Sequence, residues 1–164
     1  MAFRRRSNSE MRVRDIELYY AAYNNDVLKA RIAIVLGADV NCKNLEGYTP
    51  LCIASKKGNS DVVSLLISKG ADPNVATANK FTPLMFAVMN GDMHMVMTLV
   101  NYGALTGLKN IGGYDAYELA ESHGKENVAK YLKRFHPEHK KRLQEMDLKR
   151  GSEALMRLRR NIEG

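Results

Sequence analysis

The sequence predicts an all-α fold of stacked helix–turn–helix units, because three features recur along the chain at one interval. The stretch TPLCIASKKGN at 49–59 returns 33 residues later as TPLMFAVMNGD at 82–92. The stretch GADVN at 37–41 returns as GADPN at 70–74, and more loosely as GALTG at 103–107. Single residues also recur at this interval, namely Gly58, Gly91 and Gly124, and Ala21, Ala54, Ala87 and Ala120. A fixed period of this length is typical of a solenoid.

The first helix of each unit has a start signal and a stop signal. Thr-Pro at 49–50 and at 82–83 supplies a good N-cap followed by proline at the first helical position, where a missing N–H costs nothing. Gly58 and Gly91 suit the left-handed residue that ends a helix. We therefore expect short first helices between these residues.

The second helix of each unit is predicted from SDVVSLLISK at 60–69 and DMHMVMTLVNY at 92–102, whose apolar residues have helical spacing. Gly70 and Gly103 end these helices, and polar turn formers follow, which predicts a hairpin-like loop before the next unit. Neither helix is long enough to be stable alone, so the units must stack to bury a core. The recurring alanines allow the helices to approach closely.

These residues together resemble the ankyrin repeat. Thr-Pro-Leu, an alanine three residues later, a glycine four residues after that, and Gly-Ala-Asp-x-Asn at a 33-residue period are similar to the family's pattern. We expect four repeats, at about 12–43, 44–76, 77–109 and 110–135. The first has Ile16-Glu17 in place of Thr-Pro, and the fourth has Asp115-Ala116, in which Asp115 is still a sound N-cap.

The sequence departs from the family pattern at two positions. The residue after Thr-Pro-Leu is usually histidine in the family, whereas here the three equivalent residues are Cys52, Met85 and Glu118. The loop-tip glycine is present as Gly47 and Gly113 but is Lys80 between the second and third repeats. If that position needs a positive φ, the lysine is strained and the geometry of its loop is in question.

Charge divides the chain into a neutral centre and two basic ends. Residues 1–14 hold five arginines and one glutamate, 15–135 hold twelve basic and twelve acidic residues, and 136–164 hold eight basic and five acidic residues. We therefore predict a basic N-terminal tail at 1–14, a repeat domain at 15–135 and a basic helical tail at 136–164. The longest apolar run is six residues, too short to cross a bilayer. Two cysteines are too few for a disulfide framework, so we expect a cytoplasmic or nuclear protein.

The resemblance implies a protein partner, bound at the loop tips and the inner face of the first helices, and it implies no catalysis. Tyr48, Phe81 and Tyr114 occupy equivalent positions in three successive loops, where they either form a binding hot spot or pack against neighbouring loops. Lys56 and Lys57 form either a local basic patch or a solvated pair. The full set of candidate partner-binding residues is Leu45, Glu46, Tyr48, Lys56, Lys57, Asn79, Phe81, Met89, Asn90, Ile111, Tyr114, Ser122 and His123.

No pattern in the sequence predicts a catalytic residue, a cofactor or a metal site. His136-Pro137-Glu138-His139 is interpreted as a solvated junction after the last repeat rather than a metal site. The methionine-rich run at 93–97 is interpreted as core filling, because residues two apart on a helix face different ways. Cys42 and Cys52 lack the spacing of a zinc site.

The basic ends leave several interpretations open. The segment SEALMRLRRNIEG at 152–164 places Leu155, Leu158 and Ile162 on one helical face. It either caps the last repeat, binds an acidic protein, RNA or membrane surface, or is disordered. Ser7 and Ser9 follow an arginine run and are candidate phosphorylation sites. The candidate tail contacts are Arg4, Arg5, Arg6, Arg157, Arg159 and Arg160.

The function that the sequence favours is that of an intracellular adaptor or scaffold, monomeric on its own or part of a larger complex. Two alternatives stay open. One is a structural subunit of an RNA–protein or cytoskeletal assembly, anchored by its arginine-rich ends. The other is an inhibitor of an enzyme, similar to the small ankyrin-type inhibitors of cyclin-dependent kinases.

Overall fold

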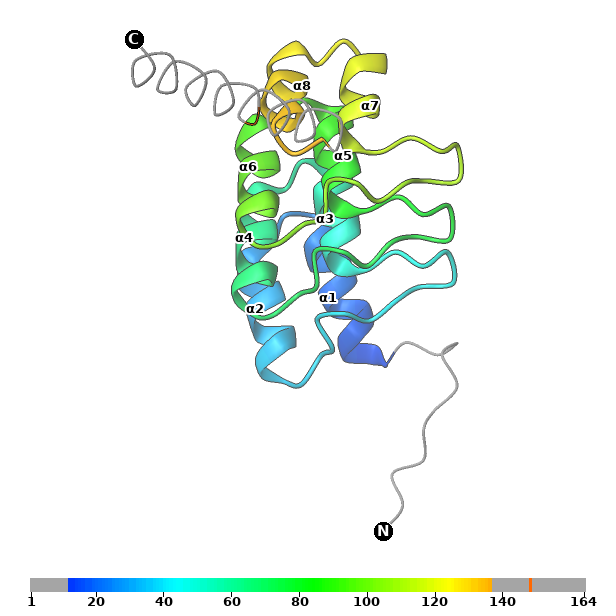
Figure 1. Ribbon diagram of the computed structural model, residues 1–164. Coiled ribbons are helices and arrows are strands. Elements are labelled where there is room, and N and C mark those ends of the chain that lie inside the picture. Colours follow the sequence, from blue (N-terminus) through cyan, green and yellow to red (C-terminus); the bar gives the residue numbers. More distant parts are fainter. Residues whose placement is uncertain (1–11, 137–147, 149–164) are drawn as a thin grey trace, which may run out of the picture.

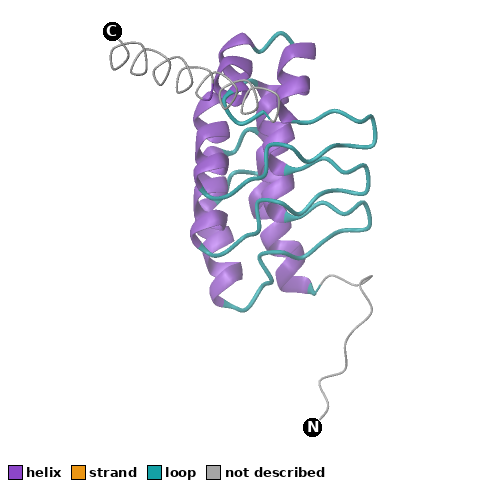
Figure 2. Ribbon diagram, viewed as in Figure 1, coloured by secondary structure: helices purple, strands orange, loops and turns teal. Residues whose placement is uncertain are grey.

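The computed structural model describes residues 12–136 and residue 148, and over these residues it contains helices and loops but no strand (Figure 2). The prediction of an all-α fold is therefore confirmed. The helices follow one another in antiparallel pairs, one pair to each predicted repeat (Figure 1). They are α1 (Val13–Tyr23), α2 (Val27–Val35), α3 (Pro50–Lys57), α4 (Ser60–Ser68), α5 (Pro83–Asn90), α6 (Met93–Asn101), α7 (Ala116–Ser122) and α8 (Glu126–Lys133).

The helices form two parallel rows. The first helices, α1, α3, α5 and α7, pack side by side in one row, and the second helices, α2, α4, α6 and α8, pack in the other. Three long loops project from the row of first helices to the same side (Figure 1). We call them the finger loops, at 41–48, 74–81 and 107–114.

The internal repeats begin and end their first helices as predicted. The Thr49 hydroxyl accepts a hydrogen bond from the Cys52 amide (3.1 Å), and Thr82 caps α5 in the same way. Pro50 and Pro83 occupy the first helical positions. Gly58 ends α3 with a φ of 79°. A β-carbon would be strained in this left-handed conformation, which explains the recurring glycine.

The terminal repeats begin their first helices differently. α1 starts at Val13, so the last two residues of the predicted tail at 1–14 belong to the first helix. The buried Asp15 carboxylate explains this early start, because it accepts the Arg12 amide (3.1 Å) and the Asp39 amide (2.8 Å). In the last repeat Asp115 caps α7, as predicted, by accepting the Glu118 amide (2.9 Å).

One apolar core runs between the two rows of helices through all four repeats. Equivalent leucines Leu18, Leu51 and Leu84 are fully buried, and the four recurring alanines are buried at the helix contacts. Of the methionine run interpreted as core filling, Met95 is fully buried and confirms it, whereas Met97 is 42% exposed and does not fill the core. Burial of this row supplies the stability that the short helices lack on their own.

Within the described residues, no helix has the length and apolar character that a membrane span needs. The predicted tails lie mostly outside the described residues. The candidate contacts Arg4, Arg5, Arg6, Arg157, Arg159 and Arg160, and the serines Ser7 and Ser9, therefore stay predictions from sequence.

Candidate partner-binding surface

The finger loops share one hydrogen-bonded geometry. In each loop a polar side chain accepts a hydrogen bond from the backbone amide of the aromatic residue four positions later. Asn44 accepts from Tyr48 (2.8 Å), Thr77 from Phe81 (3.1 Å) and Asn110 from Tyr114 (3.1 Å). Backbone hydrogen bonds also join neighbouring loops, from the Ala78 amide to the Glu46 carbonyl (2.9 Å) and from the Ile111 amide to the Asn79 carbonyl (3.2 Å). These bonds hold the three loops in register as one surface.

The loop that carries Lys80 keeps this geometry. Lys80 adopts a φ of 59°, in the left-handed region, and its amide donates to the Thr77 carbonyl (2.8 Å). The Gly47 and Gly113 amides make the equivalent bonds. The chain therefore tolerates the strain of a left-handed lysine, because the neighbouring hydrogen bonds over-determine the turn.

Three aromatic rings form a cluster between the second and third repeats. The side chain of Phe86, on α5, is buried and lies between two rings from successive finger loops. Its ring centroid is 5.8 Å from that of Tyr48 and 5.5 Å from that of Phe81, and both pairs are stacked. Both loop rings are half-buried against the core, whereas Tyr114 in the last loop is exposed. Tyr48 and Phe81 thus pack between neighbouring repeats while part of each ring stays accessible to a partner.

This cluster forms the floor of an open groove of about 630 Å³. Seven of the residues that line it were singled out from the sequence, and Phe86 was not. The sequence does not single out Phe86, because its equivalents Ile53 and Leu119 are ordinary core residues. Only the fold-back of two finger loops over α5 shows that its ring also shapes the surface. The lining residues are Leu45, Glu46, Tyr48, Lys56, Thr77, Ala78, Asn79, Phe81, Phe86 and Met89.

Two lysines at the end of α3 are held against aromatic rings. The Lys56 ammonium donates to the Tyr48 hydroxyl (3.0 Å) and lies 4.9 Å from the centroid of that ring. The Lys57 ammonium lies 4.1 Å from the centroid of the Tyr23 ring, and its hydrogen bond lowers the pKa of Tyr23. Neither lysine takes part in an ion pair with another described residue. The aromatic rings therefore hold the two positive charges in place, but no acidic side chain of a described residue neutralises them.

The remaining candidate residues differ in how free their side chains are. The Asn90 side chain donates from its Nδ2 atom to the Ser55 and Lys56 backbone carbonyls (3.0 and 3.3 Å), so it joins α5 to the end of α3. Ser122 and His123 both hydrogen-bond to the Leu119 carbonyl at the end of α7. Leu45 and Ile111 are exposed at the finger tips. The structure thus gives Asn90, Ser122 and His123 roles in holding helix ends, beside any role in binding.

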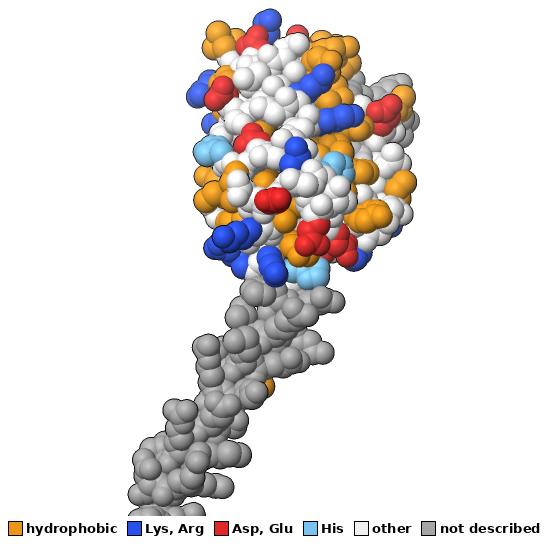
Figure 3. All heavy atoms as spheres, turned by 90° about the horizontal axis from the view of Figure 1, so that it is seen from above, with side chains coloured by type: hydrophobic (Ala, Val, Ile, Leu, Met, Phe, Trp, Pro, Cys, Tyr) orange, Lys and Arg blue, Asp and Glu red, His pale blue; other side chains and the backbone are white. Residues whose placement is uncertain are grey.

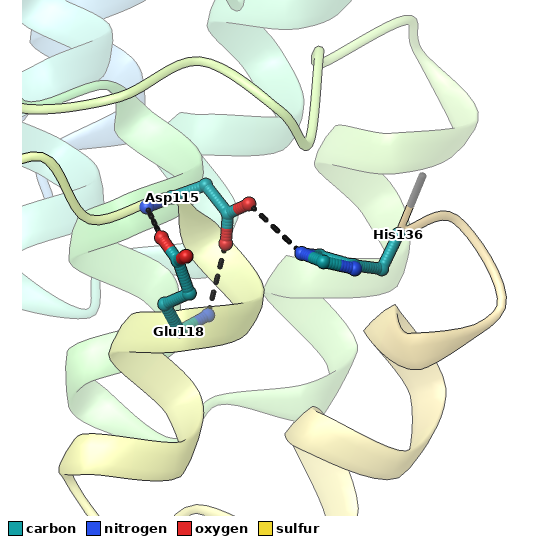
Figure 4. A group of neighbouring side chains, drawn as sticks. All are labelled: Asp115, Glu118 and His136. Carbon is teal, nitrogen blue, oxygen red and sulfur yellow. Dashed lines mark hydrogen bonds and ion pairs between the residues drawn. The ribbon is translucent and has the colours of Figure 1, made fainter. Parts of the chain in front are cut away.

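A cluster at the start of α7 corrects the interpretation of His136 as a solvated residue (Figure 4). Its Nε2 atom lies 3.5 Å from the buried Asp115 carboxylate, and its ring packs on Tyr117 with centroids 4.9 Å apart. Because Asp115 opens α7 and His136 follows α8, this pair ties together the two ends of the last repeat. His139 lies outside the described residues.

The donor atoms of Asp115, Glu118 and His136 lie within 4.8 Å of one another, close enough to consider a metal ion. However, both carboxylates already have partners. Glu118 accepts the Asp115 amide (2.8 Å) and forms an ion pair with Lys109 (3.1 Å). These interactions keep the Glu118 pKa below its usual value. A cation would have to displace Lys109 and open the helix cap, so the arrangement fits a helix start better than a metal site.

The cysteines are buried and unpaired with each other. Burial raises the pKa of Cys42 to about 12 and also raises that of Cys52. Thiolates are the reactive form, so neither thiol is prepared for nucleophilic chemistry or metal binding at neutral pH.

Comparison with known protein families agrees with this architecture. The family model for ankyrin repeats (3 copies) matches residues 18–110 and again residues 65–144, which together cover most of the chain. A search of curated proteins finds no match. This family match, together with the four stacked helix pairs and three finger loops found at residues 12–136, establishes that the chain belongs to the ankyrin-repeat family.

Proposed function

We propose that the protein is a non-enzymatic adaptor that binds a protein partner through the groove between the second and third repeats. Ankyrin repeats are in general protein-interaction modules. The observation that carries the proposal is the open groove over the Tyr48, Phe81 and Phe86 cluster, rimmed by exposed Leu45 and half-buried Met89. Aromatic clusters with an apolar rim are typical of binding hot spots.

The groove favours a partner segment that pairs an apolar side chain with a carboxylate. An apolar side chain seated on the Phe86 cluster would bury surface that water now covers. A neighbouring carboxylate would meet Lys56, which lines the groove and whose ammonium group takes part in no ion pair among the described residues. Such a charge pair contributes to partner choice and association rate more than to affinity.

The basic ends support a second contact in this proposal, with an acidic surface of the partner or of RNA. This part rests on the excess of arginine and lysine at 1–14 and 136–164. A complex held by the apolar groove should depend weakly on salt, whereas one held by the tails should weaken steeply as salt rises. Salt dependence therefore separates an adaptor from an assembly subunit anchored by its ends.

Quantitative affinity capture with matched variants tests the proposal. The groove variant is Leu45→Asp, and the control is Leu105→Asp, which changes another exposed leucine (57% exposed, against 89% for Leu45) that does not line the groove. We expect Leu105→Asp to capture the same partners as the unaltered protein. We expect Leu45→Asp to lower the captured amount of those partners at least tenfold. The proposal is wrong if Leu45→Asp retains every partner while deletion of 1–11 or 137–164 removes them.

A further inference from the structure

The first repeat exposes apolar residues at positions that the second repeat buries. Tyr20 on α1 is 61% exposed, although the equivalent residues Ile53 and Phe86 are each 6% exposed. Ile32 on α2 is 49% exposed, whereas the equivalent Leu65 is 8% exposed. These positions carry apolar residues, as they do in an internal repeat, but in the first repeat the side chains are in contact with water.

These positions face the preceding repeat. Leu119 is equivalent to Tyr20 and is buried, although α7 has only a preceding neighbour, α5, among the described first helices. Phe86 likewise stacks on Tyr48, which belongs to the preceding repeat. In the first repeat no described unit precedes α1 and α2, so the same positions face outwards.

The outward face of the first repeat forms a groove of about 390 Å³ between α1 and α2. Its apolar lining includes Ile16, Tyr20, Ile32 and Leu36, all of them exposed. Its acidic groups are Glu17 and Asp26. Asp26 forms an ion pair with Lys29 (3.2 Å), and Glu17 takes part in none of the ion pairs found among the described residues.

The opposite end of the stack is polar at the corresponding contacts. Glu121 is exposed where the equivalent Ser55 and Val88 are buried, and Lys133 is exposed where the equivalent Ile67 is buried. Figure 3 views this end and shows basic and acidic side chains interspersed with hydrophobic ones over it. Charged residues suit a last repeat that faces water. The exposed apolar groove at the first repeat therefore calls for an occupant, because such surface is costly to leave in water.

A groove between two antiparallel helices accepts a third helix that carries an apolar stripe. The chain has such a segment at 152–164, with Leu155, Leu158 and Ile162 at helical spacing. As a helix it would be about 20 Å long, against about 16 Å for α1. Its arginines at 157, 159 and 160 complement Glu17, the acidic residue of the groove that has no ion-pair partner among the described residues, since Asp26 is paired with Lys29.

The geometry favours docking between two copies. The chain leaves the repeats after α8, at the end of the stack opposite to α1 and α2 (Figure 1). Three steps between repeats, at roughly 10 Å each, separate the two ends by about 30 Å. Residues 137–151, if helical as their sequence predicts, would reach only about 22 Å.

We propose that residues 152–164 of one copy bind the groove between α1 and α2 of a second copy. The contact is head-to-tail, so each copy has one groove and one segment to offer, and assembly continues beyond a dimer unless a ring closes. This proposal goes beyond partner binding in the groove over Phe86 and replaces the sequence-based expectation of a monomer.

Sedimentation velocity of the full chain over a concentration series, with two complementary variants, tests the proposal. Ile32→Glu places a charge in the groove, and Leu158→Glu places one in the apolar stripe. Each variant alone should sediment as a monomer, while the unaltered chain should assemble as concentration rises. An equimolar mixture should form one-to-one dimers and nothing larger, because it contains one intact groove and one intact segment. Val35→Glu changes an exposed valine of α2 outside the groove and should assemble like the unaltered chain.

Other occupants give different results, and each would overturn the proposal. If Ile32→Glu is monomeric but Leu158→Glu still dimerises, two copies pack groove to groove. If the full chain is monomeric at every concentration and Leu158→Glu lowers its melting temperature, the segment binds its own copy. If assembly is lost only on deletion of residues 1–11, the N-terminal segment is the occupant. Circular dichroism of each variant confirms that it is folded.

Discussion

The internal and terminal repeats follow one 33-residue pattern but begin their first helices with different chemistry. The internal helices α3 and α5 begin with the neutral hydroxyls of Thr49 and Thr82. In the terminal repeats the Asp115 carboxylate caps α7, and the Asp15 carboxylate, in the first turn of α1, accepts the amides of Arg12 and Asp39. A carboxylate makes stronger hydrogen bonds with backbone amides than a hydroxyl does, and its charge is stabilised near the positive end of the helix dipole. A repeat with a neighbour on one side thus has a stronger local start than a repeat held from both sides.

The burial of equivalent side chains also differs between internal and terminal repeats. An internal repeat buries the residues that face both neighbours, whereas the first repeat leaves Tyr20 and Ile32 in contact with water. The repeat pattern therefore determines where a side chain points, and the neighbouring repeat determines what that side chain contributes to stability. Four pairs of substitutions test this difference.

The largest effect is expected at the position shared by Ile53 and Tyr20. Ile53→Ala removes a buried side chain and should lower the free energy of unfolding by about 3 kcal/mol. Tyr20→Ala removes a larger side chain that is mostly exposed and should cost less than about 1 kcal/mol in the monomer. Urea unfolding at low protein concentration measures both. Equal losses would show that the first repeat is packed as tightly as the second.

The helix starts should give the next largest effect. Asp15→Ala leaves the Arg12 and Asp39 amides without their acceptor at a buried site and should cost about 2 kcal/mol. Thr82→Ala removes one cap to the Met85 amide and should cost about 1 kcal/mol. Thermal unfolding of the two variants decides the order, and a larger loss for Thr82→Ala would contradict the view that terminal repeats depend more on their caps.

These comparisons also show which features the sequence could predict. The helix starts at Thr-Pro, the left-handed glycines and the stacked architecture follow from local chemistry repeated at a fixed period, and the structure confirms them. The role of Phe86 depends on two loops folding over it, and the pairing of His136 with Asp115 depends on the path of the chain after α8. Contacts between distant segments leave no local pattern, so sequence analysis found neither.

The third comparison concerns left-handed residues that are not glycine. Lys80 in the third repeat has a φ of 59°, and Asn25 in the first repeat has a φ of 56°. Lys80→Gly should stabilise the protein by about 0.5 to 1 kcal/mol, because relief of strain exceeds the entropy that glycine adds to the unfolded chain. Asn25→Gly should be nearly neutral, since asparagine tolerates this conformation. Differential scanning calorimetry measures the two shifts, and equal gains would mean that the loop at Lys80 carries no special strain.

The smallest effect is a dependence on pH that only the terminal repeats should show. Hydrogen bonding of the Asp115 amide to the Glu118 carboxylate, and the nearby Lys109, lower the pKa of Glu118 from its usual 4.5. Because the folded pKa is the lower one, the stabilisation is present above pH 4.5 and is lost as the pH falls through the folded value.

Glu118→Gln keeps a hydrogen-bond acceptor but removes this titration, so unfolding of the variant should depend less steeply on pH below 4.5. Hydrogen exchange of α7 amides between pH 3 and pH 6 is the measurement, with Glu17→Gln, whose carboxylate caps no helix, as the control. The threonine-capped helices α3 and α5 have no titrating group at their caps, so their protection should be unchanged by Glu118→Gln. If α5 lost protection in acid to the same extent as α7, the stack would unfold as one unit, and the difference between terminal and internal repeats would have no energetic consequence.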